Sequence, residues 1–227
     1  IDQKVYRRIQ PKWDNERKTL ELTQTALIGK IAERFKEHIP DSRKTKFTPL
    51  PEKLDKTDPN EISDDDWEEA QHFDFPGFVC SLGYVAEWSK PELLFTRSYL
   101  STYLRRWDMT RVNYAKQALM YMIHHKMYGT IYSKNTDAHG PFVISAFADG
   151  SLMNESKSRS RVARLVKMAG ASVAAKTNKT TTVHLSSASV ETEAACHAAL
   201  DVVGIRHLLE EIGIWYNKPV VIYEDRV

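Results

Sequence analysis

The stretch from residue 143 to residue 227 constrains the fold more than any other part of the chain. Short apolar runs there predict four strands, at residues 143–149, 161–168, 172–175 and 181–185. Apolar residues at helical spacing predict a long helix that begins at Ser189 and ends at Gly213. A closing strand is predicted at residues 220–223. Strands, then a helix, then a strand predict an α/β (α+β) domain in which a helix packs on a sheet.

Three acidic residues stand where these predicted elements begin or end. Asp149 ends the first strand, Glu191 opens the helix, and Asp225 follows the closing strand. Carboxylates from separate elements can hold two divalent metal ions about 3.5–4 Å apart, the arrangement that cleaves phosphodiesters. Magnesium suits such a site because it prefers oxygen ligands. On spacing alone, an aspartate at a strand end more often serves a turn. A glutamate in a first helical turn more often complements the helix dipole.

Five short blocks of this stretch share a pattern with one family of proteins. Residues 186–195, SSASVETEAA, are similar to the motif SSTEAEYxAL without a gap. Residues 158–160 and 176–183 resemble RKS…KSKKQTTVALSS. Residues 205–213 resemble LRRLLEELG, and residues 222–225 resemble IYCDN. Together these blocks resemble the ribonuclease H domain of copia-type LTR retrotransposon Pol polyproteins, and they are more specific than a single motif.

This resemblance implies a ribonuclease H-like mixed sheet with a flanking helix at residues 141–227. It implies a hydrolase, an endonuclease that cleaves the RNA strand of an RNA–DNA hybrid. Asp149, Glu191 and Asp225 are the implied catalytic residues and metal ligands, by their places in the family motifs. They would hold two Mg²⁺ ions, for which Mn²⁺ can substitute, and the ions would activate water and stabilise the leaving oxygen.

The resemblance also implies a nucleic-acid surface and partners. The hybrid would be recognised by its shape, its 2′-hydroxyls and its phosphates rather than by base sequence. The implied nucleic-acid-binding residues are Ser158, Arg159, Lys176 and Lys179. Residues 150–180 hold seven basic residues against one glutamate, a net charge of +6, which favours a phosphate-binding face. The other expected partner is the rest of the Pol polyprotein or another protein chain, with no membrane.

The N-terminal residues 1–39 predict a hairpin and a helix. Polar residues 15–17 mark the turn, and Thr23 is the expected N-cap of a helix over residues 24–36. Residues 19–35 resemble LxLSQTKYIEKLLERF, a segment that follows the polymerase palm in the same polyproteins. The YxDD motif of that palm is absent from the sequence. We therefore expect a post-palm reverse transcriptase segment without a polymerase active site.

The middle of the chain divides into an acidic and an apolar part. Residues 52–69 hold nine acids and two lysines, a net charge of −7, and predict a solvated linker over residues 40–71. Residues 72–133 predict a helical connection region interrupted at Lys90–Pro91, and they resemble the connection region of the same polyproteins. Five cations there could contact phosphates or simply solvate the outer face: Arg97, Arg105, Arg106, Arg111 and Lys116.

The sequence also departs from the family in ways that leave alternatives open. Glu193 lies two residues after Glu191, so either glutamate could be the ligand, and the ungapped match to the family motif favours Glu191. The family carries a fourth aspartate on a later helix, and the chain ends at Val227 without it. We therefore expect a C-terminally truncated domain that cleaves poorly. The second hypothesis is a degenerate or domesticated retroelement remnant that acts as a non-catalytic nucleic-acid-binding or scaffold module.

Composition places the chain among globular proteins. Hydrophobic residues make up 42% and charged residues 27% of its 227 residues, and no apolar run approaches a membrane span. The N-terminus lacks Met and shows no signal peptide, so we expect a fragment or processed product. Cys80 and Cys196 are expected to pack in the core. Two cysteines form no disulfide framework or zinc motif, which favours an intracellular location, in the cytoplasm or nucleus.

Overall fold

The protein forms two compact units that differ in their secondary structure. The computed structural model describes residues 8–39, 48–134, 143–153 and 155–224. The helical unit comprises residues 1–13 and 21–130, and the sheet unit comprises residues 14–20 and 131–227. Helices and sheets are both present, which confirms the α+β fold class.

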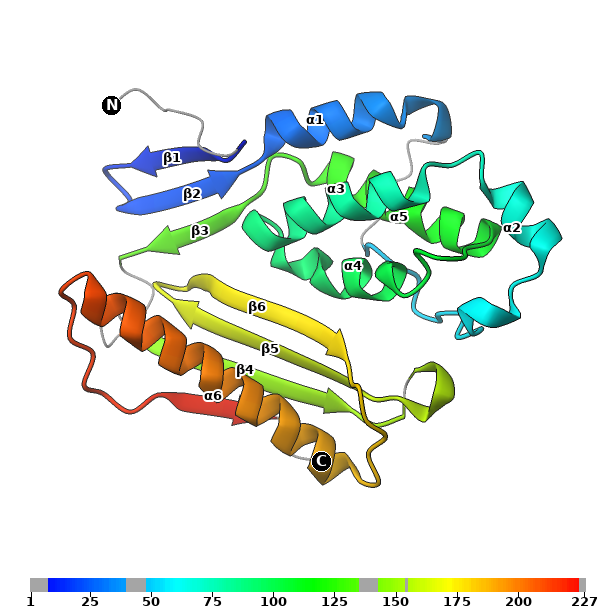
Figure 1. Cartoon of the computed structure of the whole chain (residues 1–227). Helices are drawn as coiled ribbons and strands as arrows, with labels where there is room; N and C mark the ends of the chain where they lie inside the picture. The colour runs from blue at the N-terminus through cyan, green and yellow to red at the C-terminus, as the bar shows by residue number, and fades with distance from the viewer. Residues whose placement is uncertain (1–7, 40–47, 135–142, 154, 225–227) are drawn as a thin grey trace. The chain divides into compact units, whose positions relative to one another are not determined.

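Within residues 8–39 and 48–134, the chain forms a hairpin, one further strand and five α-helices, which Figure 1 labels. The strands β1 (Gln10–Asp14), β2 (Thr19–Thr23) and β3 (Thr130–Ser133) form a sheet of order β1-β2-β3. The helices are α1 (Thr25–Arg34), α2 (Asp64–Ala70), α3 (Phe75–Trp88), α4 (Leu94–Ser101) and α5 (Met109–His124). Short 3-10 helices are η1 (Lys36–His38), η2 (Pro59–Glu61) and η3 (Pro91–Leu93).

Acidic side chains begin two of the longer helices. Asp74 accepts a hydrogen bond from the Gly77 amide at 3.0 Å, and Asp108 accepts one from the Arg111 amide at 2.9 Å. Each bond satisfies one of the free N–H groups of a first helical turn. The prediction that Thr23 is the N-cap of α1 is wrong. The N-cap residue is Gln24, and its side chain makes no capping hydrogen bond.

The core of the helical unit is rich in aromatic residues. The rings of Phe35, Phe73 and Phe78 pack with centroids between 5.3 and 5.9 Å apart. Phe75 stacks on Trp107 at 5.4 Å. The three phenylalanines at 73, 75 and 78 are fully buried. Burial of such large side chains is the main favourable contribution to folding, and it fixes the helices of this unit against one another.

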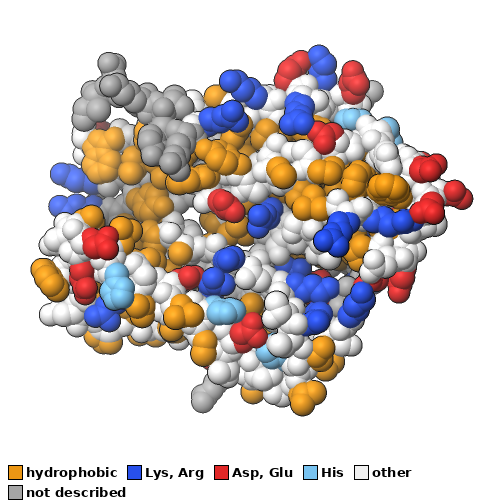
Figure 2. All heavy atoms as spheres, in the orientation of Figure 1, with side chains coloured by type: hydrophobic (Ala, Val, Ile, Leu, Met, Phe, Trp, Pro, Cys, Tyr) orange, Lys and Arg blue, Asp and Glu red, His pale blue; other side chains and the backbone are white. Residues whose placement is uncertain are grey.

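The acidic segment is folded, so its interpretation as a solvated linker is wrong for residues 48–71. Leu50, Ile62 and Ala70 are buried in the aromatic core. Helix α2 begins at Ser63, whose hydroxyl accepts a hydrogen bond from the Asp66 amide. Most of the acids lie outside, although Asp58 is buried. Figure 2 shows acidic side chains gathered where Figure 1 places α2. A few apolar residues therefore anchor a segment whose composition is mostly polar. Residues 40–47 lie outside the described residues.

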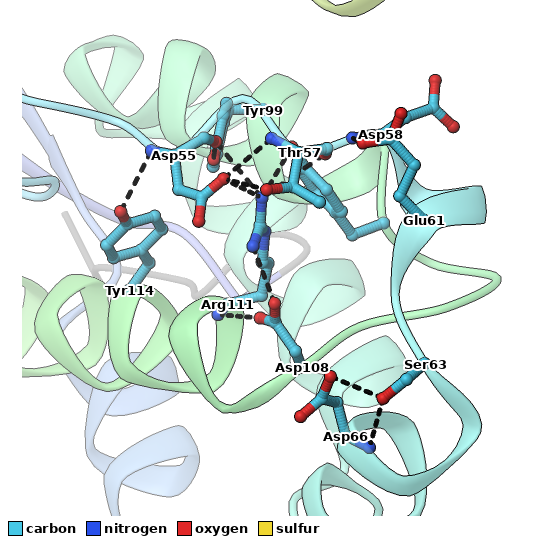
Figure 3. A network of polar contacts seen from close by, with 11 residues as sticks. Asp55, Thr57, Asp58, Glu61, Ser63, Asp66, Tyr99, Asp108, Arg111 and Tyr114 are labelled. Atoms are coloured by element: carbon cyan, nitrogen blue, oxygen red, sulfur yellow. Dashed lines mark hydrogen bonds and ion pairs between the residues drawn. The ribbon is translucent and has the colours of Figure 1, made fainter.

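A buried arginine holds this segment onto α5 (Figure 3). Arg111 has no exposed surface, and its Nη2 donates to the Asp55 carboxylate at 3.0 Å and to the Tyr103 hydroxyl at 3.2 Å. Its Nη1 donates to Asp108 at 2.8 Å. Two carboxylates compensate the buried charge, as burial of a guanidinium requires. Arg111 is therefore a structural residue and not a phosphate contact.

The sheet unit is a four-stranded mixed sheet with one helix across it (Figure 1). Its strands are β4 (Ile144–Ser151), β5 (Arg161–Met168), β6 (Ala171–Lys179) and β7 (Val221–Glu224). The order is β6-β5-β4-β7. Strand β5 is antiparallel to both β4 and β6, and β7 is parallel to β4. A short 3-10 helix, η4 (Ser156–Ser158), lies between β4 and β5.

Helix α6 (Ser187–Glu211) covers one face of this sheet. Its buried residues face the strands: Val190, Ala194, Ala198, Val202 and Leu209. In β4 the alternate residues Ile144, Ala146 and Ala148 are buried with them. This alternation follows from the two-residue repeat of a strand, and it orients β4 relative to the helix.

Several expectations for the sheet unit need correction. Residues 181–185 do not form a strand; β6 instead continues to Lys179 and the chain then turns into α6. Cys80 and Cys196 are both exposed rather than packed in the core.

Candidate metal centre

Asp149 lies near the end of β4, opposite Ala163 of β5. Its side chain is exposed, and strand alternation places it on the face opposite Ala148 and Gly150. In the described residues, β7 pairs with β4 only as far as Ala148 and Glu224. Strand β4 continues to pair with β5 through Ser151.

Gly150 brings the end of β4 into contact with the first turns of α6. A Cβ atom added at Gly150 would lie 2.8 Å from the carbonyl carbon of Val190 and 2.9 Å from the amide nitrogen of Glu191. Real Cβ atoms do not approach backbone so closely, so only glycine permits this packing. The residue next to Asp149 thus touches the residue that carries the second carboxylate. The sequence shows this glycine but not what it meets.

Glu191 faces the sheet. It precedes Ala198, Val202 and Leu209 by 7, 11 and 18 residues, spacings that fall on one face of an α-helix. Those three residues are buried against the strands. Glu191 is half-buried at the start of the same stripe. Glu191 is therefore a carboxylate on an otherwise apolar stripe beside the end of β4, whereas the Asp149 side chain leaves that strand on its other face.

Glu193 lies on another side of α6 and has a partner. Its Oε2 accepts from His184 Nε2 at 2.8 Å. At 3.6 residues per turn, Glu193 is about 200° around the helix from Glu191, so the two carboxylates point in different directions. Of the two glutamates that the sequence leaves open, the geometry favours Glu191 as the candidate ligand.

Asp225, the third expected ligand, lies outside the described residues, and its role stays a prediction. The pair Ala148 and Glu224 is the last in the described register between β4 and β7. Asp149 and Asp225 are the next residues in the sequence after that pair.

Two described carboxylates make a partial ligand set. In the part of the chain that the structure covers, no three His, Cys, Asp or Glu side chains lie together in a group that could hold a metal ion. Among those same residues, the carboxylates of Asp149 and Glu191 make no hydrogen bond or ion pair. Carboxylate oxygens are the donors that Mg²⁺ prefers. The donor chemistry therefore fits magnesium, with further ligands required from elsewhere.

The expected nucleic-acid-binding residues gather at the same end of the sheet. Ser158 and Arg159 lie in the connection that follows β4, and Ser158 is exposed with a positive φ of 53°. Lys179 pairs with Arg161, which pairs in turn with Ser151 at the end of β4. Lys176 is exposed on the edge strand β6, three residues further from that end.

Ion pairs reduce the charge that this basic segment can offer to phosphates. Arg161 is 5% exposed and donates to Glu155 at 2.6 Å. Arg164 donates to Asp201 of α6 at 2.5 Å. Both guanidinium groups are engaged inside the unit, so the net charge of +6 overstates the surface available to nucleic acid. In the helical unit, Arg106 likewise pairs with Asp64.

Comparison with other proteins adds no identification. No family model, curated protein or solved structure matches this chain. None of the helices in the described residues has the length and apolar character needed to span a bilayer. The carboxylate pair at the junction of β4 and α6 is therefore interpreted from its own geometry.

Proposed function

We propose that the sheet unit is a ribonuclease H-type hydrolase that cleaves the RNA strand of an RNA–DNA hybrid. The observation that carries this proposal is the contact of Gly150 with Val190 and Glu191, which brings the end of β4 that carries Asp149 against the turns of α6 that carry Glu191. The strand order supports it, because three antiparallel strands, a helix and a parallel fourth strand follow the order expected of that fold.

The residues have distinct roles in this proposal. Asp149, Glu191 and Asp225 would hold magnesium. Bound magnesium would activate a water molecule and stabilise the leaving 3′ oxygen. Asp149 projects from the end of a paired strand and Glu191 from a half-buried helix face, so both carboxylates are held on rigid elements. Such preorganisation lets charge build up in the transition state without reorganisation of the site.

The neighbouring residues would bind the substrate backbone. Ser158 and Arg159 lie in the connection after β4, and Lys179 lies at the same end of β6. Hydroxyl and guanidinium groups contact phosphates and fix the register of a nucleic acid without reading its bases. A hybrid substrate implies an intracellular setting, and the remainder of a Pol polyprotein is the expected protein partner.

A metal titration tests the site directly. We expect the wild-type protein to bind Mn²⁺ and the Asp149→Asn variant to lose that binding, while circular dichroism shows an unchanged fold. Glu211→Gln is the matched control, because Glu211 is exposed at the far end of α6. Unchanged Mn²⁺ affinity in Asp149→Asn would reject the metal site and favour the non-catalytic module.

Salt dependence tests the nucleic-acid surface. If several phosphates are neutralised, the slope of log affinity against log salt for a hybrid should reach several units. Replacement of Arg159 by Ala should reduce that slope by about one unit. Replacement of Arg164, which is engaged with Asp201, should leave it unchanged. A flat salt response would exclude this surface.

A further inference from the structure

Two side chains of the connection between β6 and α6 contact the helix: Ser186 caps its first turn by accepting from the Ser189 amide, and His184 contacts its side. In this segment Val183 is 50% exposed and Leu185 is 92% exposed, so neither apolar side chain anchors it. The side chain of His184, which lies between them, is only 11% exposed. A polar residue that is more buried than its apolar neighbours indicates specific contacts rather than packing.

Both ring nitrogens of His184 contact side chains of α6. Nδ1 lies 3.2 Å from the Ser189 hydroxyl, and Nε2 lies 2.8 Å from the Glu193 carboxylate. Since a carboxylate accepts, Nε2 carries the proton. The Ser189 hydroxyl donates to the Ser186 carbonyl at 2.8 Å, and its oxygen faces Nδ1 of His184. Ser189 and Glu193 are one helical turn apart and share a side of α6. His184 therefore spans the second turn of the helix.

That side of α6 lies away from Glu191. Glu191 is about 200° around the helix from both Ser189 and Glu193. The apolar residues that hold this end of the helix to the sheet are Val190, Ala194 and Ala198. Alanine side chains are short and interlock little with a neighbour, so they resist rotation about the helix axis weakly. The contacts of His184 supply the missing constraint from the opposite side.

We propose that His184 is a positioning residue for the carboxylate site: it fixes the rotation of α6 that keeps Glu191 turned toward β4. The effect on metal binding rests on the proposed function. The contact of His184 with Ser189 and Glu193, the His184 clamp, does not. His184 touches neither expected ligand of the described site, and it acts through the helix. The same contact occupies Glu193 and keeps it out of the site.

The clamp can be tested without metal. In the metal-free protein, His184→Ala should raise amide hydrogen exchange across the first three turns of α6 about tenfold or more and leave the C-terminal turns unchanged. His207→Ala is the matched control, because His207 is exposed on the same helix. Glu193→Gln should give a smaller rise, since the amide still accepts from His184. Unchanged exchange in His184→Ala would refute the clamp.

Its consequence for the site is tested by Mn²⁺ titration at a temperature where every variant is folded. His184→Ala should weaken Mn²⁺ affinity by about 10-fold, the lower end of effects seen when supporting residues of a metal site are lost. His184→Gln, which keeps a donor for Glu193, should recover part of this loss. Raised exchange with unchanged affinity would overturn the positioning role. Retained affinity in Asp149→Asn would instead reject the metal site itself.

Discussion

Both units contain a pair of carboxylates near the start of a helix, but the two pairs differ in their hydrogen-bond and ion-pair partners. In the helical unit, Asp55 and Asp108 are engaged by the buried Arg111. In the sheet unit, Asp149 and Glu191 have no hydrogen-bond or ion-pair partner among the described residues. The carboxylates around Arg111 are therefore a closed cluster, in the sense that ion pairs occupy them. Asp149 and Glu191 are open carboxylates, because no such partner occupies them in the described part of the chain.

The difference separates acids that stabilise a fold from acids that can bind a ligand. A carboxylate that already accepts charged hydrogen bonds must give them up before it can bind a metal ion, at a cost of roughly 1.5–3 kcal/mol for each bond. The net charge of −7 over residues 52–69 therefore does not by itself indicate a ligand site, because Asp55, the member of the segment that contacts Arg111, is engaged. Asp149 and Glu191 accept no such bonds among the described residues, so metal binding at these carboxylates would not carry that cost.

The largest expected effect comes from breaking the closed cluster. Arg111→Ala should lower the free energy of unfolding by about 3–5 kcal/mol, because it leaves two carboxylates beside a buried void with no compensating charge. Chemical denaturation followed by tryptophan fluorescence measures the change. Arg97→Ala, at an exposed position, should alter stability by no more than about 0.5 kcal/mol. Equal effects for both arginines would show that the cluster is not structural.

The next effect concerns the contact that brings the open carboxylates together. Gly150→Ala places a methyl group against the backbone of Val190 and Glu191, and overpacking of this kind costs about 1–3 kcal/mol. It should also weaken Mn²⁺ binding, because α6 must move away from β4. Gly204→Ala is the matched control, since nothing lies within 4 Å of that Cβ position. That variant should stabilise α6 by about 0.5–1 kcal/mol.

A third prediction compares one acid from each cluster. Asp108→Ala should lower the free energy of unfolding by about 0.5–2 kcal/mol, the usual loss for an N-cap residue. The loss should lie at the upper end of this range or above it, because the substitution also removes a partner of Arg111. Asp149→Ala should change the free energy of unfolding by no more than about 0.5 kcal/mol, because its side chain is exposed and has no described partner. Denaturation curves of the two variants measured side by side decide the matter. A large loss in Asp149→Ala would mean that this carboxylate is structural.

How far the sequence predicts this fold depends on the range of the interactions. Apolar periodicity predicts α1, α5 and α6 within a few residues, because each helix buries one stripe of its own side chains. It misses β3 entirely, since a four-residue strand is stabilised by its neighbours. It also misjudges residues 48–71, where Leu50, Ile62 and Ala70 are too few to stand out from their acidic surroundings.

The candidate site shows the same limit. Asp149 and Glu191 are recognisable from the motifs around them, but the choice between Glu191 and Glu193 is not settled by those motifs. It depends on helix rotation and on His184, a residue that the sequence places in an expected strand. Arg161 and Arg164 carry the sequence signal of a phosphate-binding face, yet Glu155 and Asp201 engage them. Contacts between residues 6 and 37 positions apart cannot be inferred from local composition.

The smallest expected effect is a pH dependence that belongs to the closed cluster. Hydrogen bonds from the Thr57 hydroxyl and amide, together with Arg111, lower the pKa of Asp55 below its ordinary value of 3.8. A carboxyl whose pKa is depressed by folding stabilises the protein above its unfolded pKa. That contribution is lost as the pH falls through the lower, folded value. The contribution of Asp55 to the stability of the helical unit should therefore be constant from pH 7 to about pH 5 and should fall below pH 4. Asp55→Asn should reduce the stability lost between pH 4 and pH 2, as measured by denaturation at each pH. The same acid-induced loss in Asp55→Asn and the wild type would mean that the Arg111 cluster does not depend on this charge, and would weaken the contrast between the two sets of carboxylates.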